Sequence, residues 1–452
     1  MFQNRVHKSI ILILSVLFIN NIPATAQLKI SLQEAIELAK KNNLQLKQSE
    51  NDVSVAYQNK RQAKLDVYPN LNAVTGANLN FGRSLDPASY TYVNQQTVSS
   101  STNITTSFVV FQGFQKSNLI KENDYLWESS KSATKKVEND LVLTVVATYL
   151  NILALKDQLD AANQQYQLTQ QQFEFEKKNY LIGKKVTADL SRVKFQEAKA
   201  QLNLTTIQNQ LNNQKLELLQ LLNLEPGIKV QLISPTDAIN QSYKDSVATI
   251  YKVAVNSLPE IKQADYARLA ATKAIDVAKG GFYPKLIFSA SMASDYSRGL
   301  QSNLITFDFA PNNFFAQSRR NLYEVLGLNL SIPVFNNSIS KINLSKAKLN
   351  LRSAELNESI VKSNLYKVIN QAYGDADASE KNYETAQKAY ESTKETFDVI
   401  QKRYKVGLSN SLDLIQAQDD MNTAEYSLIR AKYDMIFKRK ILDFYSGKPI
   451  TY

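Results

Sequence analysis

The sequence predicts a mainly α-helical protein that also has membrane-type β-strands. Residues 114–181 and 338–404 are long helical stretches in which apolar side chains recur at every seventh position. Four shorter segments alternate apolar and polar side chains, as strands with one face in lipid do. The whole pattern occurs twice along the chain. These observations favour long coiled-coil hairpins combined with four strands of a barrel that several chains share.

The first 26 residues have the features of a secretory signal. A basic start is followed by an apolar run from Ile10 to Ile19 and by Ala24-Thr25-Ala26, a small-x-small cleavage site. The apolar run is too short to cross a bilayer as a helix, and we expect no later run that is long enough. Cleavage would leave a mature chain that begins at Gln27 and contains no cysteine. We therefore expect an exported protein without disulfides or an N-terminal lipid.

The mature chain lacks the residues that most enzymes and metal sites use. The one histidine, His7, lies in the predicted signal, and the chain has 0 cysteines. The usual metal ligands, thiol nucleophiles and histidine bases are therefore missing, so we predict no enzymatic activity, no metal and no cofactor. A hydrolase that uses only carboxylates remains an alternative, supported by nothing more than abundant Asp and Glu.

The net charge of +11 comes from 53 basic and 42 acidic residues. The Lys and Arg residues are scattered along the helical stretches, which is typical of solvated helix faces and not of a nucleic-acid-binding surface. We therefore predict no nucleic-acid partner.

A tandem repeat organises the chain. Gly183 corresponds to Gly407 at an offset of 224 residues, and the residues around both glycines correspond as well. The repeat predicts two copies of one structural unit, residues 27–223 and residues 245–452. Residues 224–244 are expected to connect the copies, because they contain proline and glycine.

A shorter helix opens each copy. Ser31 and Glu34 form a capping-box pattern at the start of the first helix, which we expect to run towards Tyr68-Pro69. Its counterpart is expected to begin near Ser246 and to end at Gly280-Gly281.

Each long helical stretch begins a hairpin. Residues 114–181 contain no proline and no internal glycine, and a helix of that length spans ~100 Å. A sustained seven-residue repeat implies left-handed coiled-coil packing of the two arms. The repeat positions of the outgoing arms are Leu159, Tyr166, Phe173 and Tyr180 in the first copy and Tyr383, Tyr390, Phe397 and Tyr404 in the second. Those of the returning arms include Leu190, Val193, Ala200, Leu204, Ile207, Leu211, Leu218 and Leu221, and then Leu414, Ala417, Met421, Ala424, Leu428, Ala431 and Leu442.

The hairpin tips share a sequence pattern. Gly183 and Gly407 interrupt the helices, as expected for glycines in a left-handed turn. Thr187 and Ser411 follow four positions later, and we predict that their hydroxyls cap the returning helices. An aspartate follows two positions after each hydroxyl, in the first helical turn, where the helix dipole favours a negative charge.

Four strand segments lie between the shorter helices and the hairpins. Their apolar faces consist of Leu71, Ala73, Ala77, Leu79 and Phe81, of Ile104, Phe108 and Val110, of Leu286, Phe288, Ala290 and Met292, and of Leu322, Leu326, Leu328 and Leu330. Their opposite faces are rich in Asn, Ser and Thr, which suit a wet channel lumen, and Glu324 is an exception on an apolar face. A fragment of a soluble β-sandwich is the alternative. The polar stretches 83–101 and 298–320 are expected to be exposed loops.

Four strands cannot close a barrel, and an open sheet edge cannot face lipid. Closure therefore requires several subunits: two would supply eight strands and three would supply twelve. The strand pattern by itself is compatible with both numbers.

The order of signal, helix, strand pair and long hairpin, followed by the same elements again, resembles the TolC family of outer-membrane efflux proteins. The most specific features are the tips NYLIG, which ends at Gly183, and RYKVG, which ends at Gly407, each followed six residues later by aspartate. The resemblance implies a homotrimer with a twelve-stranded barrel in outer-membrane lipid and a helical tunnel across the periplasm of a Gram-negative type of cell. It also implies a passive channel of a tripartite efflux or type I secretion system, which a periplasmic adaptor joins to an inner-membrane pump.

The resemblance assigns roles to residues at the tips. It places adaptor docking at Tyr180, Gly183, Tyr404 and Gly407, and the tunnel entrance at Asp189, Arg192, Asp413 and Gln416. Family members close the entrance with a basic residue after the second tip and carry two lumen aspartates three residues apart. Here Ser409 stands in place of the basic residue and Gln416 in place of the second aspartate, so we expect Arg192 to supply charge instead.

A secreted coiled-coil scaffold or adhesin without transport activity is the alternative from a different class of protein. In that case the strand segments would pack as an ordinary β domain. Extraction that requires detergent and an oligomer whose migration changes on heating would favour the channel. Drug efflux and protein secretion both remain open as the natural task.

Overall fold

The computed structural model describes residues 28–85, 90–94, 96–225, 227–228, 230–234, 245–300 and 311–448. The predicted signal, residues 1–26, lies outside the described residues, as does much of the predicted connection at 224–244.

The chain divides into two compact units. The helical unit contains the segment up to Ser49 together with Lys135–Leu258 and Ser363–Tyr452. The sheet unit contains Glu50–Thr134 and Pro259–Lys362.

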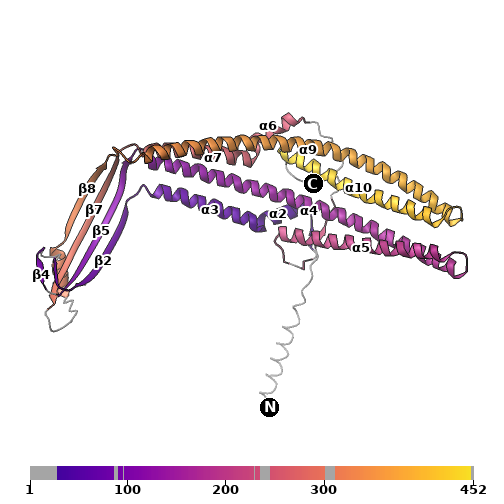
Figure 1. The fold of residues 1–452 in the computed structure, drawn as a ribbon, viewed down its shortest axis with the longest axis horizontal. Coiled ribbons are helices and arrows are strands. Elements are labelled where there is room, and N and C mark those ends of the chain that lie inside the picture. The colour runs from indigo at the N-terminus through magenta and orange to yellow at the C-terminus, as the bar shows by residue number, and fades with distance from the viewer. Residues whose placement is uncertain are drawn as a thin grey trace, which may run out of the picture. The chain divides into compact units, whose positions relative to one another are not determined.

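Two long hairpins dominate the helical unit. In the first, α4 (Gln115–Leu181) is followed by α5 (Thr187–Leu221), and in the second, α9 (Ile339–Lys405) is followed by α10 (Ser411–Tyr445). The arms of each hairpin run side by side in Figure 1. Both outgoing helices have 67 residues and begin and end within one residue of the predicted bounds. About the first third of each, up to Thr134 in α4 and up to Lys362 in α9, belongs to the sheet unit.

The predicted coiled-coil positions form the interior of the hairpins. On the returning arms, buried repeat residues include Val193, Ala200, Ile207, Leu211 and Leu218 of α5 and Leu414, Ala417 and Leu442 of α10. Packing of these side chains against the outgoing arm explains why the sequence keeps a seven-residue repeat. The predicted coiled-coil hairpins are confirmed.

The centre of the helical unit is its most deeply buried part. Tyr149 of α4 is 0% exposed, and its one hydroxyl hydrogen is shared between the backbone oxygens of Ile30 at 3.0 Å and Ile233 at 2.8 Å. These two residues border a parallel sheet of β1 (Leu28–Ile30) and β6 (Val230–Leu232). Tyr149 therefore ties α4 to both strands.

We expected no run after the signal that is long enough to cross a bilayer, and α4 departs from that expectation. The helix contains a stretch that is long and apolar enough to cross a membrane, with a mean hydropathy of 1.3. Of that stretch, 56% is buried inside the structure, so its apolar side chains pack as protein core.

The shorter helices are each broken once. The first is divided into α2 (Leu32–Asn42) and α3 (Leu44–Leu65), because the side chain of Asn43 accepts a hydrogen bond from the amide of Leu46 at 3.1 Å. The capping box of Ser31 and Glu34 at the start of α2 is confirmed.

In the second copy, α6 (Val247–Ser257) begins after Ser246, as predicted, and α7 (Pro259–Gly280) follows. Pro259 has no amide hydrogen to continue the ladder of α6 and instead opens the next helix.

The sheet unit contains one four-stranded antiparallel sheet in the order β2-β5-β7-β8. Its strands are β2 (Asn70–Asn80), β5 (Gln96–Gln112), β7 (Lys285–Leu300) and β8 (Tyr323–Ser331). All four predicted strands are present. Because opposed residues share a face, the register keeps the predicted apolar and polar faces separate except at a bulge between Val109 and Phe111, where Phe111 and not the predicted Val110 lies opposite Leu286.

The stretches that we expected to be loops contain more structure. The first holds β3 (Arg83–Leu85) and β4 (Tyr92–Asn94), and β5 already begins at Gln96. The second holds the end of β7 and the helix α8 (Pro311–Arg320). The predicted loops at 83–101 and 298–320 are therefore wrong in their bounds.

Candidate functional site at the hairpin tips

Both tips turn through a glycine in the left-handed conformation. The φ angles of Gly183 and Gly407 are +73° and +79°. The amide of Gly183 donates to Tyr180 O at 3.0 Å, and the amide of the following Lys184 donates to Asn179 O at 2.9 Å. The second tip repeats this pair of bonds, which is the Schellman ending of a helix. The predicted glycine turns are confirmed.

The caps of the returning helices differ from the prediction. Thr187 and Ser411 are the first helical residues of α5 and α10, and neither is the cap. The cap of α5 is Val186, which makes no side-chain hydrogen bond. The cap of α10 is Asn410, whose side chain accepts from the amide of Asp413 at 2.8 Å. Each cap lies one residue earlier than predicted, because the glycine turn ends sooner.

Asp413 is exposed and is used within its own helix. Its carboxylate accepts from the amide of Asn410 at 3.4 Å and from Oγ of Ser409 at 2.9 Å. Gln416 is also exposed and donates to Asp420 at 2.9 Å. These two predicted entrance residues therefore make their polar contacts along α10.

The other two entrance residues meet the second hairpin. Ser411 is 4% exposed, and its Oγ donates to Asp189 Oδ1 at 3.0 Å. Arg192 donates to the same Oγ at 3.2 Å and lies 3.5 Å from the Asp189 carboxylate. The structure thus brings Asp189 and Arg192 together around a buried hydroxyl of α10, which joins α5 to the second hairpin.

A second cross-link between the hairpins was missed by sequence reasoning. The hydroxyl of Tyr404 donates to the carboxylate of Glu176, a side chain that is 1% exposed. Lys185 lies 3.9 Å from the other carboxylate oxygen and 5.0 Å from the centre of the Tyr404 ring. Burial, and then the hydrogen bond and charge of Glu176, raise the pKa of Tyr404 above its ordinary value. At the offset of 224, Glu176 of the first copy corresponds to Ile400 of the second. An acidic residue where the other copy has an apolar one is the feature of the sequence that could have pointed to Glu176.

Polar contacts continue along the line where α10 meets the first hairpin. Gln418 donates to Thr169, Tyr426 donates to Gln165, and Tyr433 donates to Asp157. We call this line of contacts, from Tyr404 to Tyr433, the polar seam. The two hairpins also share apolar contacts, because Met435 and Ile436 of α10 lie in the same buried cluster as α4, and the hydrogen bonds of the polar seam add to that packing.

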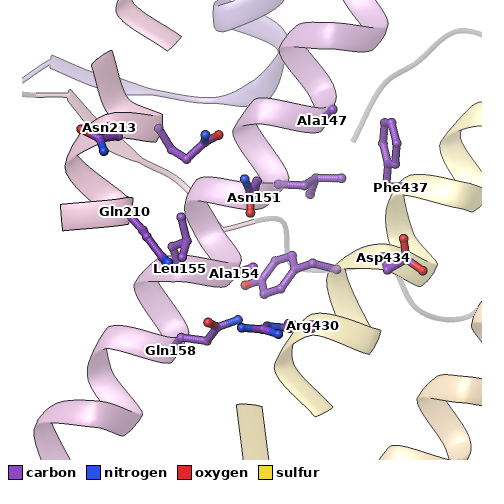
Figure 2. A pocket seen from close by; sticks show the side chains of 13 residues that line it. Ala147, Asn151, Ala154, Leu155, Gln158, Gln210, Asn213, Arg430, Asp434 and Phe437 are labelled. Carbon is purple, nitrogen blue, oxygen red and sulfur yellow. The ribbon is translucent and has the colours of Figure 1, made fainter. Parts of the chain in front are cut away.

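The polar seam ends beside a cavity of about 590 Å³ between α4, α5 and α10. Figure 2 shows Asn151 and Gln158 of α4, Gln210 of α5, and Arg430 of α10 around it. The lining mixes these polar side chains with apolar ones, among them Leu150, Leu155 and Phe437. Within the described ranges, no cluster of three or more His, Cys, Asp or Glu side chains is placed to hold a metal ion.

Known proteins match this chain over nearly its whole length. The model of the outer membrane efflux protein family matches residues 35–224 and again residues 250–448. The pyoverdine export outer membrane protein OpmQ of Pseudomonas aeruginosa is 26% identical over 203 residues, which are 44% of this chain and 39% of that relative. The alignment therefore spans well under half of the relative's length.

Solved structures share the fold at lower identity. The outer membrane protein VceC of Vibrio cholerae superposes with a TM-score of 0.74 at 16% identity, covering 93% of this chain and 97% of that one. The CmeC outer membrane channel of Campylobacter jejuni gives 0.75 at 16% identity, with 93% and 87% covered. With its hairpins, its sheet and both halves of its sequence accounted for by one family model and one fold, this chain belongs to the outer membrane efflux protein family.

Proposed function

We propose that this chain is the outer-membrane channel subunit of a tripartite efflux or type I secretion system, a passive conduit from the periplasm to the exterior. The two faces of the four-stranded sheet are the observation that carries the proposal. The apolar face is exposed, with fractions of 74% for Leu71, 76% for Leu326 and 68% for Leu328. The opposite face pairs Asn72 with Thr105 and consists mainly of Asn, Ser and Thr, with Val74 and Val325 among the exceptions. Such a sheet fits lipid on one side and a water-filled lumen on the other.

The sheet edges support a shared barrel. Among the described residues, β2 and β8 each pair with a single neighbouring strand. A strand edge that faces lipid leaves its peptide groups without hydrogen bonds, at a cost of several kcal/mol for each group. Pairing β8 of one copy with β2 of the next would satisfy both edges, and three copies would give twelve strands.

Exposed apolar stripes on the helices support the same assembly. On α5, Phe195, Leu202 and Leu216 are 67%, 68% and 56% exposed and lie at multiples of seven residues. On α9, Ile342, Leu349 and Leu356 have the same spacing and are 49%, 65% and 49% exposed. Coiled-coil stripes of this kind are stable when a second helix covers them. We propose that neighbouring copies of the chain supply those helices in a homotrimer.

The hairpin tips are the proposed docking surface for a periplasmic adaptor, with Tyr180, Gly183, Tyr404 and Gly407 at the turns. Apolar side chains next to both glycines are exposed: Leu181, Ile182 and Val186 at the first tip, and Val406, Leu408 and Leu412 at the second. Exposed apolar residues grouped at one end mark a protein interaction site. The adaptor would connect the channel to an inner-membrane pump, which supplies the energy for transport.

The contacts between the hairpins support a mechanism for closing the tunnel entrance. In place of the missing basic residue after the second tip, the guanidinium of Arg192 and the carboxylate of Asp189 hold Ser411 of α10. Separation of the two hairpins would break these contacts and widen the entrance. Asp413, exposed in the first turn of α10, would add negative charge to the entrance of the open tunnel.

Planar-bilayer recording tests the proposed function. Protein extracted from outer membranes in detergent should insert and give discrete conductance steps, together with an oligomer band that disappears on heating. The control is the same preparation heated until the oligomer has dissociated, which should give no conductance steps. A protein that stays soluble without detergent and produces no conductance would be a scaffold or adhesin, and the proposal would be wrong.

A further inference from the structure

The helix α8 presents a surface that the proposed conduit does not use. α8 lies against the end of β7, where the ring centroids of Phe314 and Tyr296 are 4.9 Å apart. Ser294 of β7 also donates its hydroxyl to the backbone oxygen of Ser318 at 2.6 Å. Tyr296 is 4% exposed, so α8 is held against the strand by buried contacts.

α8 packs on the lipid-facing side of the sheet. Side chains alternate along a strand, so Ser294 and Tyr296 share a face with Phe288 and Met292. β7 pairs with β5 without a register shift from Leu300 to Phe288, so this alternation is not interrupted. Only four residues, about 13 Å of strand, separate Met292 from Tyr296. α8 therefore lies on the same side of the sheet as its apolar face, just beyond the end of the apolar residues.

The side of α8 that points away from β7 is both aromatic and basic. Phe315 is 69% exposed, and Arg319, four residues later on the same side, is exposed as well. Arg320 is also exposed and adds a second positive charge in the last turn. In the part of the chain that the structure describes, neither arginine forms an ion pair with a carboxylate.

We propose that α8 is a binding site for phosphate-bearing lipid headgroups of the outer leaflet. Phe315 would lie at the boundary between headgroups and acyl chains, where aromatic residues of membrane barrels gather. Arg319 and Arg320 would bind the phosphate, because a guanidinium donates two parallel hydrogen bonds to a phosphate group. The inference rests on the proposed function, since the apolar face of the sheet must lie in lipid.

A purely internal role for the two arginines is the alternative. Positive side chains in the last turn of a helix stabilise it by interacting with the helix dipole. That role would change the stability of α8 but would give no preference for phosphate. The experiment therefore compares lipids that differ only in phosphate.

The test titrates detergent-purified full-length protein with lipid A that bears two phosphates and with the same lipid after removal of both. Bound lipid is counted by native mass spectrometry. The test variant is Arg319→Gln with Arg320→Gln, and the control is Lys29→Gln with Lys252→Gln, which removes the same charge from two exposed lysines of the helical unit. We expect the test variant to bind phosphorylated lipid A on the order of 25-fold more weakly, about fivefold for each arginine. The control should bind it as the wild type does.

A second variant keeps the positive charge in case the first does not fold. Arg319→Lys with Arg320→Lys retains the interaction of the positive charges with the helix dipole but lacks the planar guanidinium groups. The affinity of this variant for phosphorylated lipid A should therefore fall several-fold. Equal binding of the two lipid forms by the wild type, or unchanged affinity in both arginine variants, would overturn the inference and leave the channel intact. Binding of neither form by a protein that needs no detergent would overturn the proposed function as well.

Discussion

Tyr404 near the second tip donates its hydroxyl hydrogen to the carboxylate of Glu176, a side chain that is buried on the first hairpin. The bond joins residues on different hairpins that are 228 positions apart in the chain. The ammonium group of Lys185 lies 3.9 Å from the other oxygen of the Glu176 carboxylate. A buried carboxylate depends on such partners, because an unpaired charge in the interior is strongly destabilising.

Replacing Tyr404 with phenylalanine should therefore loosen the tips. The variant leaves the Glu176 carboxylate buried with one donor fewer, which costs about 1–3 kcal/mol. We expect a larger single-channel conductance and a lower temperature for separation of the tips, measured by bilayer recording and by thermal circular dichroism. Tyr390→Phe is the control, because the Tyr390 hydroxyl has no hydrogen-bond partner among the described residues. Equal effects of the two changes would rule out a role for the Glu176 contact.

Tyr149 should make the helical unit sensitive to alkali. Burial raises its pKa from 10.0 to about 12. Because the folded pKa lies above the unfolded one, the protonated hydroxyl stabilises the fold fully below pH 10, and this contribution is lost as the pH rises through 12. Thermal unfolding followed by circular dichroism across this range should show a falling midpoint in the wild type. Tyr149→Phe should be less stable at neutral pH and should show a shallower decline, and a parallel decline would contradict the assignment.

The tip glycines should be needed for transport and not for assembly. A β-branched residue at Gly183 or Gly407 has room for its Cβ but must adopt a positive φ angle, which costs about 1–2 kcal/mol. We expect Gly183→Val with Gly407→Val to abolish transport and to leave a normal heat-sensitive oligomer. Gly374→Ala is the matched control, because Gly374 lies inside α9 with open space around it, and it should transport normally. Normal transport by the double valine variant would place adaptor docking elsewhere.

Asp413 should bias the open channel towards cations more than Asp189 does. Asp413 is exposed in the first turn of α10, whereas Asp189 is held by Ser411 and Arg192. We expect Asp413→Asn to lower cation selectivity in single-channel reversal potentials, and Asp189→Asn to lower it less. If both changes alter only thermal stability, the aspartates act as helix-terminus charges, a role worth about 0.3–1 kcal/mol.

Much of the fold could be predicted because its pattern is periodic. A stretch without proline or internal glycine located α4 to within a residue, and the tandem repeat did the same for α9. Alternation of apolar and polar side chains located the four strands. The break at Asn43 could not be read from periodicity, because a local side-chain hydrogen bond interrupts a stretch that stays amphipathic. The break at Pro259 was visible as a proline and was overlooked.

The candidate site was predicted less completely, because its contacts are not local. The glycine turns follow from the residue type, and their φ angles agree. The helix caps were predicted one residue too late, because the position of a cap depends on the residue at which the glycine turn ends and the helix begins. Glu176 was missed because its partner, Tyr404, comes from the other copy of the repeat. The division of the chain at residues 224–244 stays a prediction.

The central claim is that the sheet units of three copies close one barrel, with β8 of each copy beside β2 of the next. The chain has no cysteine, so engineered pairs can report this contact without background. Ala73 of β2 and one of three β8 residues, Leu326, Leu328 or Leu330, would be changed to cysteine together, because all four lie on the apolar face. The three positions on β8 cover three successive registers of β8 against β2 of the next copy.

After oxidation in outer membranes, the samples would be run on a denaturing gel without reductant. At least one pair should give covalent dimers and trimers and nothing larger, and each single cysteine should give no trimer. Absence of cross-links in all three pairs, or a ladder that stops at dimers, would contradict a barrel closed by three copies of this chain.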